Sequence, residues 1–367
     1  MAGSSYGTMF RVTTWGESHG KGIGVVVDGC PAGLPLTEDD IQPFLDRRKP
    51  GQSRYTTSRR EEDAVEILSG TFEGLTTGTP ISMIVYNKNQ RSKDYSEIAE
   101  YYRPGHADMT YDLKYGFRDY RGGGRSSGRE TIGRTAAGAV AVKILDSLGI
   151  RLLTYTKSIG PVSVSPDNFD PAVINENPFY MPDAQAARQA AAYVEACMKN
   201  KDSAGGVIEC VIKNMKSGIG EPAFEKLSAN LGKAILSIGA VKGFEIGDGF
   251  ASAQATGQSN NDQYMRAENG SILKMSNHSG GILGGISDGS DIVFRAAVKP
   301  TPSVSVQQNT VTRDGRGISV SIKGRHDPVI VPRAVVVVES MAAITLTDML
   351  LMGVCSRMDN LIRFYKS

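Results

Sequence analysis

The sequence predicts a single domain in which helices and strands are mixed, and it disfavours a Rossmann fold. Ala- and Leu-rich segments with helical spacing occur along the chain together with short runs of β-branched residues. No βαβ pattern with a GxGxxG turn is present in the sequence. The 367 residues, 40% of them apolar, can form a sizeable core, and no Pro/Ser linker, charge block or obvious repeat divides them. We therefore treat residues 1–367 as one domain.

The elements are placed by local spacing and composition. Helices are expected where Ala, Leu and other helix formers recur at helical spacing, namely at Ile132–Leu148, Asp183–Met198, Phe224–Ile238 and Val338–Leu351. Asp183 after Pro182 has the pattern of a helix start. Strands are expected in β-branched runs bounded by turn formers, namely at Gly24–Asp28, Ile81–Tyr86, Val207–Lys213, Ile292–Val298 and Ile318–Lys323.

Charge and cysteine content exclude several classes of protein. The formal net charge of +2 gives no reason to expect nucleic acid or an anionic membrane as a partner. The four cysteines form no CxxC pair, which argues against a disulfide framework and a zinc site. The N-terminus does not resemble a signal peptide, and no segment approaches the roughly 18 apolar residues needed to span a bilayer. We expect a soluble, cytoplasmic protein without a metal site.

The densest group of candidate functional residues covers residues 103–108 and 119–131 and leads into an Ala-rich helix. Glycines 122–124 let the backbone approach an anion, and the N–H groups of the following helix start would bind phosphate oxygens. Side-chain donors in the same loop are Arg125, Ser126, Ser127 and Arg129. The GK[ST] ending of a Walker A loop is missing. A flexible turn with solvated arginines is the alternative, but the nearby His106 and further arginines favour an anion site.

A second basic cluster lies between residues 46 and 60. It contains Arg47, Arg48, Arg54, Arg59 and Arg60. Such a charge run is usually a solvated face of the protein. Arginines also suit a small ligand with several negative charges, because they stay charged and bind carboxylate or phosphate in a bidentate way. This segment alone does not decide between the two interpretations.

The four histidines, His19, His106, His278 and His326, all lie in polar, glycine-punctuated or acid-flanked contexts. No pair has the i, i+4 spacing of a metal-binding helix, which gives a zinc site little weight. Any one of them can be a hydrogen-bonded loop residue, but histidine also suits acid or base catalysis at neutral pH. We expect two of the four to be catalytic. Asp108 could hold the His106 ring in its charged form.

An ordered set of motifs resembles those of the chorismate synthase family, over nearly the entire chain. The matching segments are residues 7–20, Arg47–Arg48 with Pro50–Gln52, and residues 103–108, 121–131, 276–285, 299–303 and 323–328. Gly128 stands where the family often has alanine, and Met109 where an aromatic residue is common. Neither departure removes a functional group.

The resemblance implies an α+β fold, a β-α-β sandwich with helices packed between antiparallel sheets, assembled as a homotetramer. It also implies a carbon–oxygen lyase acting on phosphates. The expected reaction is a 1,4-anti elimination of phosphate and a C6 hydrogen from 5-enolpyruvylshikimate 3-phosphate, which gives chorismate in the shikimate pathway of aromatic amino acid biosynthesis. Reduced FMN is the implied cofactor, with no net redox change, and NADPH stays open as an external or internal reductant.

The resemblance also assigns residues. The implied FMN contacts are Arg125, Ser126, Ser127, Gly239, Ala240, Gly284, Lys299, Pro300, Thr301, Pro302, Ser303 and Arg325. The implied substrate contacts are Arg48, Arg54, Arg103, Ser127, Arg129 and Arg325, and NADP is an alternative ligand for Arg48 and Arg54. His19 would protonate the departing phosphate, His106 would protonate or stabilise reduced flavin, and Asp327 would assist proton removal at the flavin N5 edge.

Two other classes of protein remain as alternatives. A flavin reductase would share an FMN-phosphate site, but it needs a nicotinamide site and does not need so many arginines. A non-catalytic module that binds anions or RNA would explain the cluster at residues 47–60. The near-neutral charge and the absence of a basic surface interleaved with aromatic residues weaken this last interpretation.

Overall fold

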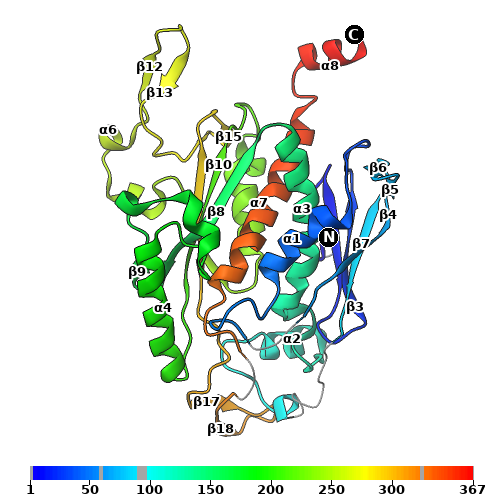
Figure 1. The fold of residues 1–367 in the computed structure, drawn as a ribbon, viewed down its shortest axis with the longest axis vertical. Coiled ribbons are helices and arrows are strands. Elements are labelled where there is room, and N and C mark those ends of the chain that lie inside the picture. The colour runs from blue at the N-terminus through cyan, green and yellow to red at the C-terminus, as the bar shows by residue number, and fades with distance from the viewer. Residues whose placement is uncertain (1–2, 58–60, 89–96, 323–325, 367) are drawn as a thin grey trace.

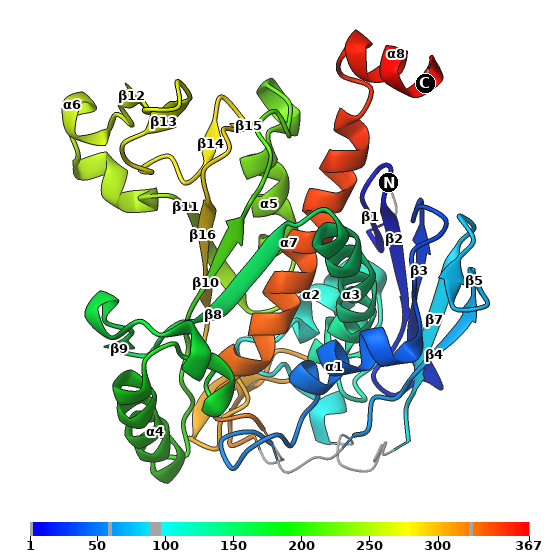
Figure 2. The same cartoon turned by 45° about the horizontal axis from the view of Figure 1, so that its top comes forward.

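Two five-stranded antiparallel sheets enclose a layer of helices in this computed structural model, which describes residues 3–57, 61–88, 97–322 and 326–366. Figure 2 shows the helices α1, α3 and α7 between the sheet that contains β2, β3 and β7 and the sheet that contains β8 and β10. The expected α+β architecture, with helices packed between antiparallel sheets, is confirmed.

The first sheet has the strand order β1-β2-β3-β7-β4. Its strands are β1 (Ser5–Tyr6), β2 (Arg11–Gly16), β3 (Gly22–Asp28), β7 (Ile81–Tyr86) and β4 (Val65–Ser69), and a small hairpin of β5 (Thr71–Phe72) and β6 (Leu75–Thr76) lies beside it. Trp15 of β2 pairs with Gly24 of β3, and its ring covers that glycine so closely that a Cβ there would lie 2.3 Å from Trp15 Cζ2. The strand position opposite Trp15 therefore requires glycine.

The second sheet has the strand order β11-β16-β10-β8-β9. Its strands are β11 (Val241–Ile246), β16 (Ile292–Val298), β10 (Gly206–Lys213), β8 (Arg151–Ile159) and β9 (Val162–Ser163). In the central strand β10, Ile208, Cys210 and Ile212 are fully buried, as the two-residue period of a strand requires for one face against the core. Three hairpins complete the β-structure: β12 (Tyr264–Arg266) with β13 (Ile272–Lys274), β14 (Ile282–Leu283) with β15 (Ile286–Ser287), and β17 (Gln308–Val311) with β18 (Gly317–Val320).

The helix layer is built around the contact between α3 (Thr131–Ser147) and α7 (Val331–Gly353), with α1 (Glu38–Arg48) packed on both. The two long helices approach closely at Gly138, where a Cβ would come within 2.2 Å of Ser340 Cβ. The remaining helices are α2 (Asp108–Tyr115), α4 (Ala184–Lys199), α5 (Leu227–Leu236), α6 (Gly257–Asn260) and α8 (Met358–Tyr365). Of these, α5 packs on α7 and β11, and α8 projects from the C-terminal end (Figure 1).

Helix α7 corrects one expectation, namely that no segment is apolar enough to span a bilayer. Among the described residues, α7 is one helix that is long and apolar enough to cross a membrane. It has 23 residues and a mean hydropathy of 1.8 in its most apolar stretch. However, 83% of that stretch is buried inside the protein, between the two sheets. It is therefore the central core helix of the fold, hydrophobic on all sides because it is surrounded.

Most local expectations are confirmed to within a few residues. Strands β7 and β16 have the expected bounds, and Asp183 caps α4 by accepting bonds from the backbone N–H groups of Gln185 and Ala186, at 2.8 and 3.0 Å. Helix α7 begins seven residues before the expected Val338, because Pro332 is tolerated in a first helical turn and the valines that follow are buried. Burial there outweighs the strand preference of a valine run.

Candidate active site

A tight turn at glycines 122–124 brings the backbone against the side chain of His19. The three glycines have left-handed φ angles of 70°, 84° and 51°. His19 is 8% exposed, and its Nδ1 lies 3.1 Å from Ser18 Oγ. A Cβ at position 122 would lie 2.4 Å from His19 Cε1, so both the backbone conformation and the imidazole require glycine there.

The loop after this turn is anchored to the first sheet by Arg125. Its guanidinium donates to the backbone oxygen of Gly16 at 3.2 Å and to Thr14 Oγ1 at 2.6 Å, both in β2. The neighbouring Ser126 is exposed, and Ser127 accepts a bond from the backbone N–H of Arg129 at the start of the turn that leads into α3. Cationic and hydroxyl groups thus surround the N-terminal end of a helix, where anions are stabilised.

Arg103 lies beside the same glycine turn. A Cβ at Gly123 would be 3.8 Å from Arg103 NH2. The Arg103 guanidinium donates two parallel hydrogen bonds to Asp108, both 2.8 Å long, and the Arg103 backbone N–H donates a third. Burial raises the pKa of Asp108, but the bonds and charge of Arg103 outweigh it and hold that pKa below its usual range. Asp108 is therefore committed to Arg103.

His106 is neutral in this structure, which corrects the expectation that Asp108 keeps it charged. Burial, followed by the positive charges of Arg103 and Lys299, lowers the pKa of His106 to about 4, and the attraction of Asp108 does not compensate. The Nε2 of its ring lies 2.8 Å from Ser303 Oγ. Lys299 donates to the backbone oxygen of Gly105 at 2.7 Å, so the segment 299–303 and the His106 loop are joined at two points.

Beneath the loop, Asp63 lies between two buried arginines. Arg48, which is 1% exposed, donates to Asp63 at 2.7 Å, and it also reaches the Gly128 oxygen and Thr131 Oγ1 at 3.3 Å. Arg129, which is 6% exposed, places NH1 3.1 Å from the other oxygen of Asp63. Burial lowers the pKa of Arg48 to about 10, although Asp63 opposes that shift. Arg48 Nε and Arg129 NH1 are buried and make no hydrogen bond among the described residues.

Of the remaining residues predicted from the sequence, those at 239–240 and 300–302 join this cluster. Ala240 accepts a bond from the backbone N–H of Lys299 at 2.9 Å, and Ser237 accepts one from Arg134 of α3 at 2.6 Å, so the turn with Gly239 joins the cluster. Pro302 packs on Gly105, and Pro300 contacts Gly205. The hydroxyl of Thr301 is buried without a hydrogen-bond partner among the described residues.

Arg54 and Gly284 lie away from this cluster. The Arg54 side chain is 74% exposed and pairs with Glu195 of α4. Gly284 forms the turn between β14 and β15, before β16 begins, whereas residues 299–303 follow the end of β16. Seven strand residues separate those ends by roughly 20 Å. Arg325 falls outside the described residues.

Asp327 holds the backbone near Arg48 in place through two hydrogen bonds. One carboxylate oxygen accepts a bond from the Thr57 backbone N–H at 2.9 Å, and the other accepts from Arg333 at 2.5 Å. Arg333 in turn donates to the backbone oxygen of Arg48 at 3.0 Å. Asp327 is thus linked to Arg48 through one side chain.

Sequence reasoning missed the acceptors that hold the arginines, which are Thr14, Asp63 and Asn87. For Asp63 a signal exists, because the acidic run Glu61–Asp63 follows the arginine-rich segment. For Asn87 and Thr14 no local pattern points to such a role. Their partners are 42 and 111 residues away in sequence.

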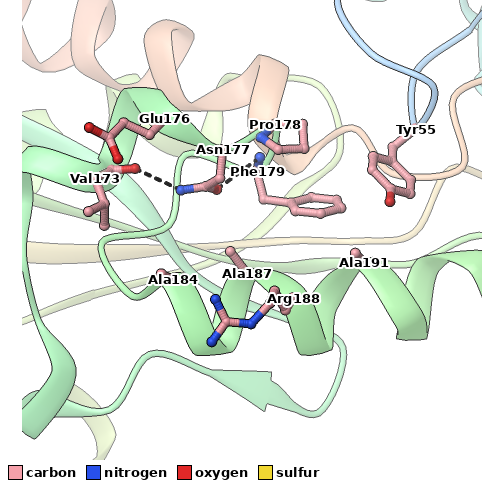
Figure 3. Close-up of a pocket in the computed structure, with 10 residues that line it drawn as sticks. All are labelled: Tyr55, Val173, Glu176, Asn177, Pro178, Phe179, Ala184, Ala187, Arg188 and Ala191. Atoms are coloured by element: carbon pink, nitrogen blue, oxygen red, sulfur yellow. Dashed lines mark hydrogen bonds between the residues drawn. The ribbon is translucent and has the colours of Figure 1, made fainter.

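A separate cleft of about 300 Å³ lies against α4 (Figure 3). It is lined by Tyr55 and Phe179, whose ring centroids are 4.8 Å apart, and by one face of α4 with Arg188 and Ala191. None of its lining residues belongs to the cluster around His19. We therefore place the candidate active site at the start of α3.

Fold and site together define an α+β protein in which cationic and hydroxyl side chains gather at the N-terminal end of a buried helix, an arrangement suited to a small anionic ligand. The family model for chorismate synthase matches residues 10–351. A chorismate synthase of Agathobacter rectalis is 67% identical over 366 residues, with 100% of both chains covered, and one of Chloroflexus aggregans is 53% identical over 351 residues, with 96% of each covered. A crystal structure of a chorismate synthase has a TM-score of 0.77 at 30% identity, covering 98% of this chain and 97% of that one.

The chain belongs to the chorismate synthase family. It is accordingly a carbon–oxygen lyase of aromatic amino acid biosynthesis that acts on a small molecule. The two alternative classes, a flavin reductase and an RNA-binding module, are set aside by this membership.

Proposed function

We propose that the chain converts 5-enolpyruvylshikimate 3-phosphate to chorismate with reduced FMN as cofactor. One observation carries the proposal: polar and glycine-containing groups from five separate segments lie together around the start of α3. They are His19, Arg103 with His106, Arg125 to Arg129, Gly239 with Ala240, and Lys299 to Ser303. The substrate carries two carboxylates and a phosphate, and preorganised cations and hydroxyls are what its charge requires.

The residues present fit a flavin mononucleotide. The exposed Ser126 hydroxyl and the half-buried Arg125 suit a phosphate at a helix start. Gly239 has open space where a Cβ would be, and the buried Thr301 hydroxyl has no hydrogen-bond partner within the described part of the chain. When bound, reduced FMN would supply an electron transiently and take it back. The proposal includes NADPH as an external or internal reductant, with Arg48 and Arg54 as its contacts if they do not serve the substrate.

In the proposed elimination the C–O bond to phosphate and the C6–H bond break, and a ring double bond forms. His19 would protonate the departing phosphate, and its fixed position against Ser18 and Gly122 supports that assignment. His106 is neutral without ligands and would take up a proton beside an anionic cofactor. Asp327 would accept a proton on its carboxylate, which in this structure is paired with Arg333.

Three further features accompany the proposed function. The chain would fold as one domain over residues 1–367, which the buried cluster running from Phe10 to Met349 supports. It would act as a cytoplasmic homotetramer without a nucleic-acid or membrane partner. It would need no metal ion, and in the described residues no group of three or more His, Cys, Asp or Glu side chains is arranged to hold one.

The test is to incubate the purified protein with 5-enolpyruvylshikimate 3-phosphate and chemically reduced FMN under anaerobic conditions, and to measure phosphate and chorismate. Equal amounts of both products, dependent on reduced FMN, are expected. FMN titrations with and without substrate accompany the assay, because an anionic reduced flavin should bind more tightly than oxidised FMN, and more tightly still with substrate. Absence of phosphate release with reduced FMN would refute the proposed reaction.

A further inference from the structure

Asn87 joins the turn that carries His19 to the buried Arg129. It follows the last residue of β7, and its backbone N–H donates to the Lys21 oxygen at 3.1 Å. Its side-chain Nδ2 donates to the backbone oxygens of Glu17 at 3.0 Å and Gly20 at 2.9 Å. These two carbonyls flank His19 on both sides in the sequence. One amide group therefore fixes both ends of the histidine turn.

The other end of the same amide holds Arg129. Asn87 Oδ1 accepts bonds from Arg129 Nε at 3.1 Å and from its NH2 at 2.8 Å. All four hydrogen-bonding positions of the amide are thereby used. These partners fix the orientation of the Asn87 amide. If the amide were reversed, its NH2 group would face the Arg129 guanidinium and its oxygen would face the two backbone carbonyls.

Arg129 is itself held in place from the opposite side. Its NH1 forms an ion pair with Asp63 at 3.1 Å, and Asp63 also accepts a bond from Arg48 at 2.7 Å. The contacts thus run without interruption from Arg48 through Asp63, Arg129 and Asn87 to the backbone around His19. Except for Asn87, which is half-buried, the side chains along this path are at most 8% exposed.

We propose that Asn87 is a positioning residue, which transmits the fixed location of Arg129 to the His19 turn and so sets the direction of the His19 ring. The inference rests on the proposed function of His19 as proton donor to the leaving phosphate. A displacement of about 1 Å at such a group can reduce turnover about 100-fold. The defect should therefore lie in kcat rather than in substrate binding.

Asn87→Asp separates the two halves of this role. The aspartate keeps an acceptor for Arg129, but it places an oxygen where Nδ2 donates to Glu17 and Gly20. Asn87→Ala removes both halves. Asn177→Asp is the matched control, because Asn177 Nδ2 also donates to two backbone oxygens, of Val173 and Met181, both at 2.8 Å. That loop lines the separate cleft of Figure 3.

The experiment measures kcat, KM and the pH profile of phosphate release, and also the His19 imidazole resonance by NMR in protein without ligands. We expect Asn87→Asp to lower kcat about tenfold or more, to leave KM within about twofold, and to move the His19 resonance. Asn87→Ala should lower kcat at least as much. Asn177→Asp should lower the melting temperature without changing kcat or the His19 resonance.

An Asn87→Asp protein with wild-type kcat and an unmoved His19 resonance would overturn the inference. If the wild-type protein itself releases no phosphate, the proposed function fails. In that case the NMR comparison still decides whether Asn87 positions His19, because it requires neither substrate nor cofactor. Should Asn87→Ala fail to fold, the more conservative Asn87→Asp variant supplies both measurements.

Discussion

Gly122 lies directly against the imidazole of His19, with an ideal Cβ at position 122 only 2.5 Å from Nδ1 and 2.4 Å from Cε1. The glycine turn is therefore part of the wall that orients the histidine, as well as a place where the backbone bends.

Gly122→Ala should lower kcat about tenfold or more, because the methyl group displaces the His19 ring from its position. The left-handed backbone adds a stability loss of about 1 kcal/mol. Gly149→Ala is the matched control, since Gly149 is also left-handed but has open space around its Cβ position. It should lose similar stability and keep its turnover. Wild-type turnover in Gly122→Ala would argue against a catalytic role for the His19 ring position.

His106 should titrate with a pKa of about 4 in protein without ligands, as followed by NMR of its imidazole resonance. Because the unfolded chain takes up this proton near pH 6.5, the free energy of unfolding should fall as pH drops from about 6.5 to about 4. Reduced FMN should raise the pKa of His106, since a nearby negative charge favours imidazolium. A pKa that stays unchanged on saturation with reduced FMN would place the flavin away from His106.

Asp63→Asn should lower the free energy of unfolding by about 3–5 kcal/mol in denaturant titrations, because it leaves Arg48 and Arg129 buried without their carboxylate. Asp46→Asn is the control, since Asp46 and Lys49 form an ion pair at the surface, which is worth at most about 1 kcal/mol. Equal losses in the two variants would contradict the central place of Asp63 in the cluster.

The ion pairs of Asp63 with Arg48 and Arg129 also predict part of the loss of protein stability in acid. Burial opposes ionisation of Asp63, but Arg48 and Arg129 hold its pKa below the usual range. The stability that Asp63 contributes is therefore fully present above its unfolded pKa of about 4 and is lost as pH falls through the lower folded value. Wild-type protein should show this loss in acid denaturation, and Asp63→Asn should lack it.

Gly138→Ala should destabilise the sandwich by about 1–3 kcal/mol, because the new Cβ would lie 2.2 Å from Ser340 Cβ in α7. Combining it with Ser340→Gly should recover part of the loss, since the second change removes the atom that clashes. Thermal unfolding of the two single variants and the double variant gives the coupling energy. Strictly additive effects would show that α3 and α7 do not meet at these positions.

Much of the fold was accessible from local patterns. Helices α3 and α4 and strands β7 and β16 follow from periodicity and composition within each segment, and the Asp183 cap follows from the pair Pro182–Asp183. Arginine, histidine and glycine-rich segments predicted an anion site, and the structure brings the His19 turn, Arg103 and the Arg125 loop together around glycines 122–124. Strands such as β8 and helix α1, with Pro43 inside it, were missed because their local signals are mixed.

Burial and pairing were decided only by contacts between residues distant in the chain. Arg48 and Arg54 lie six residues apart in one basic run, yet the first is enclosed against Asp63 and Thr131 and the second is solvated beside Glu195. His106 and Asp108 lie two residues apart in one motif, yet the Asp108 carboxylate is paired with Arg103 and the imidazole is neutral. Segment composition determines which groups are available. Desolvation and charge pairing, which depend on the three-dimensional neighbours of each group, determine what those groups can do.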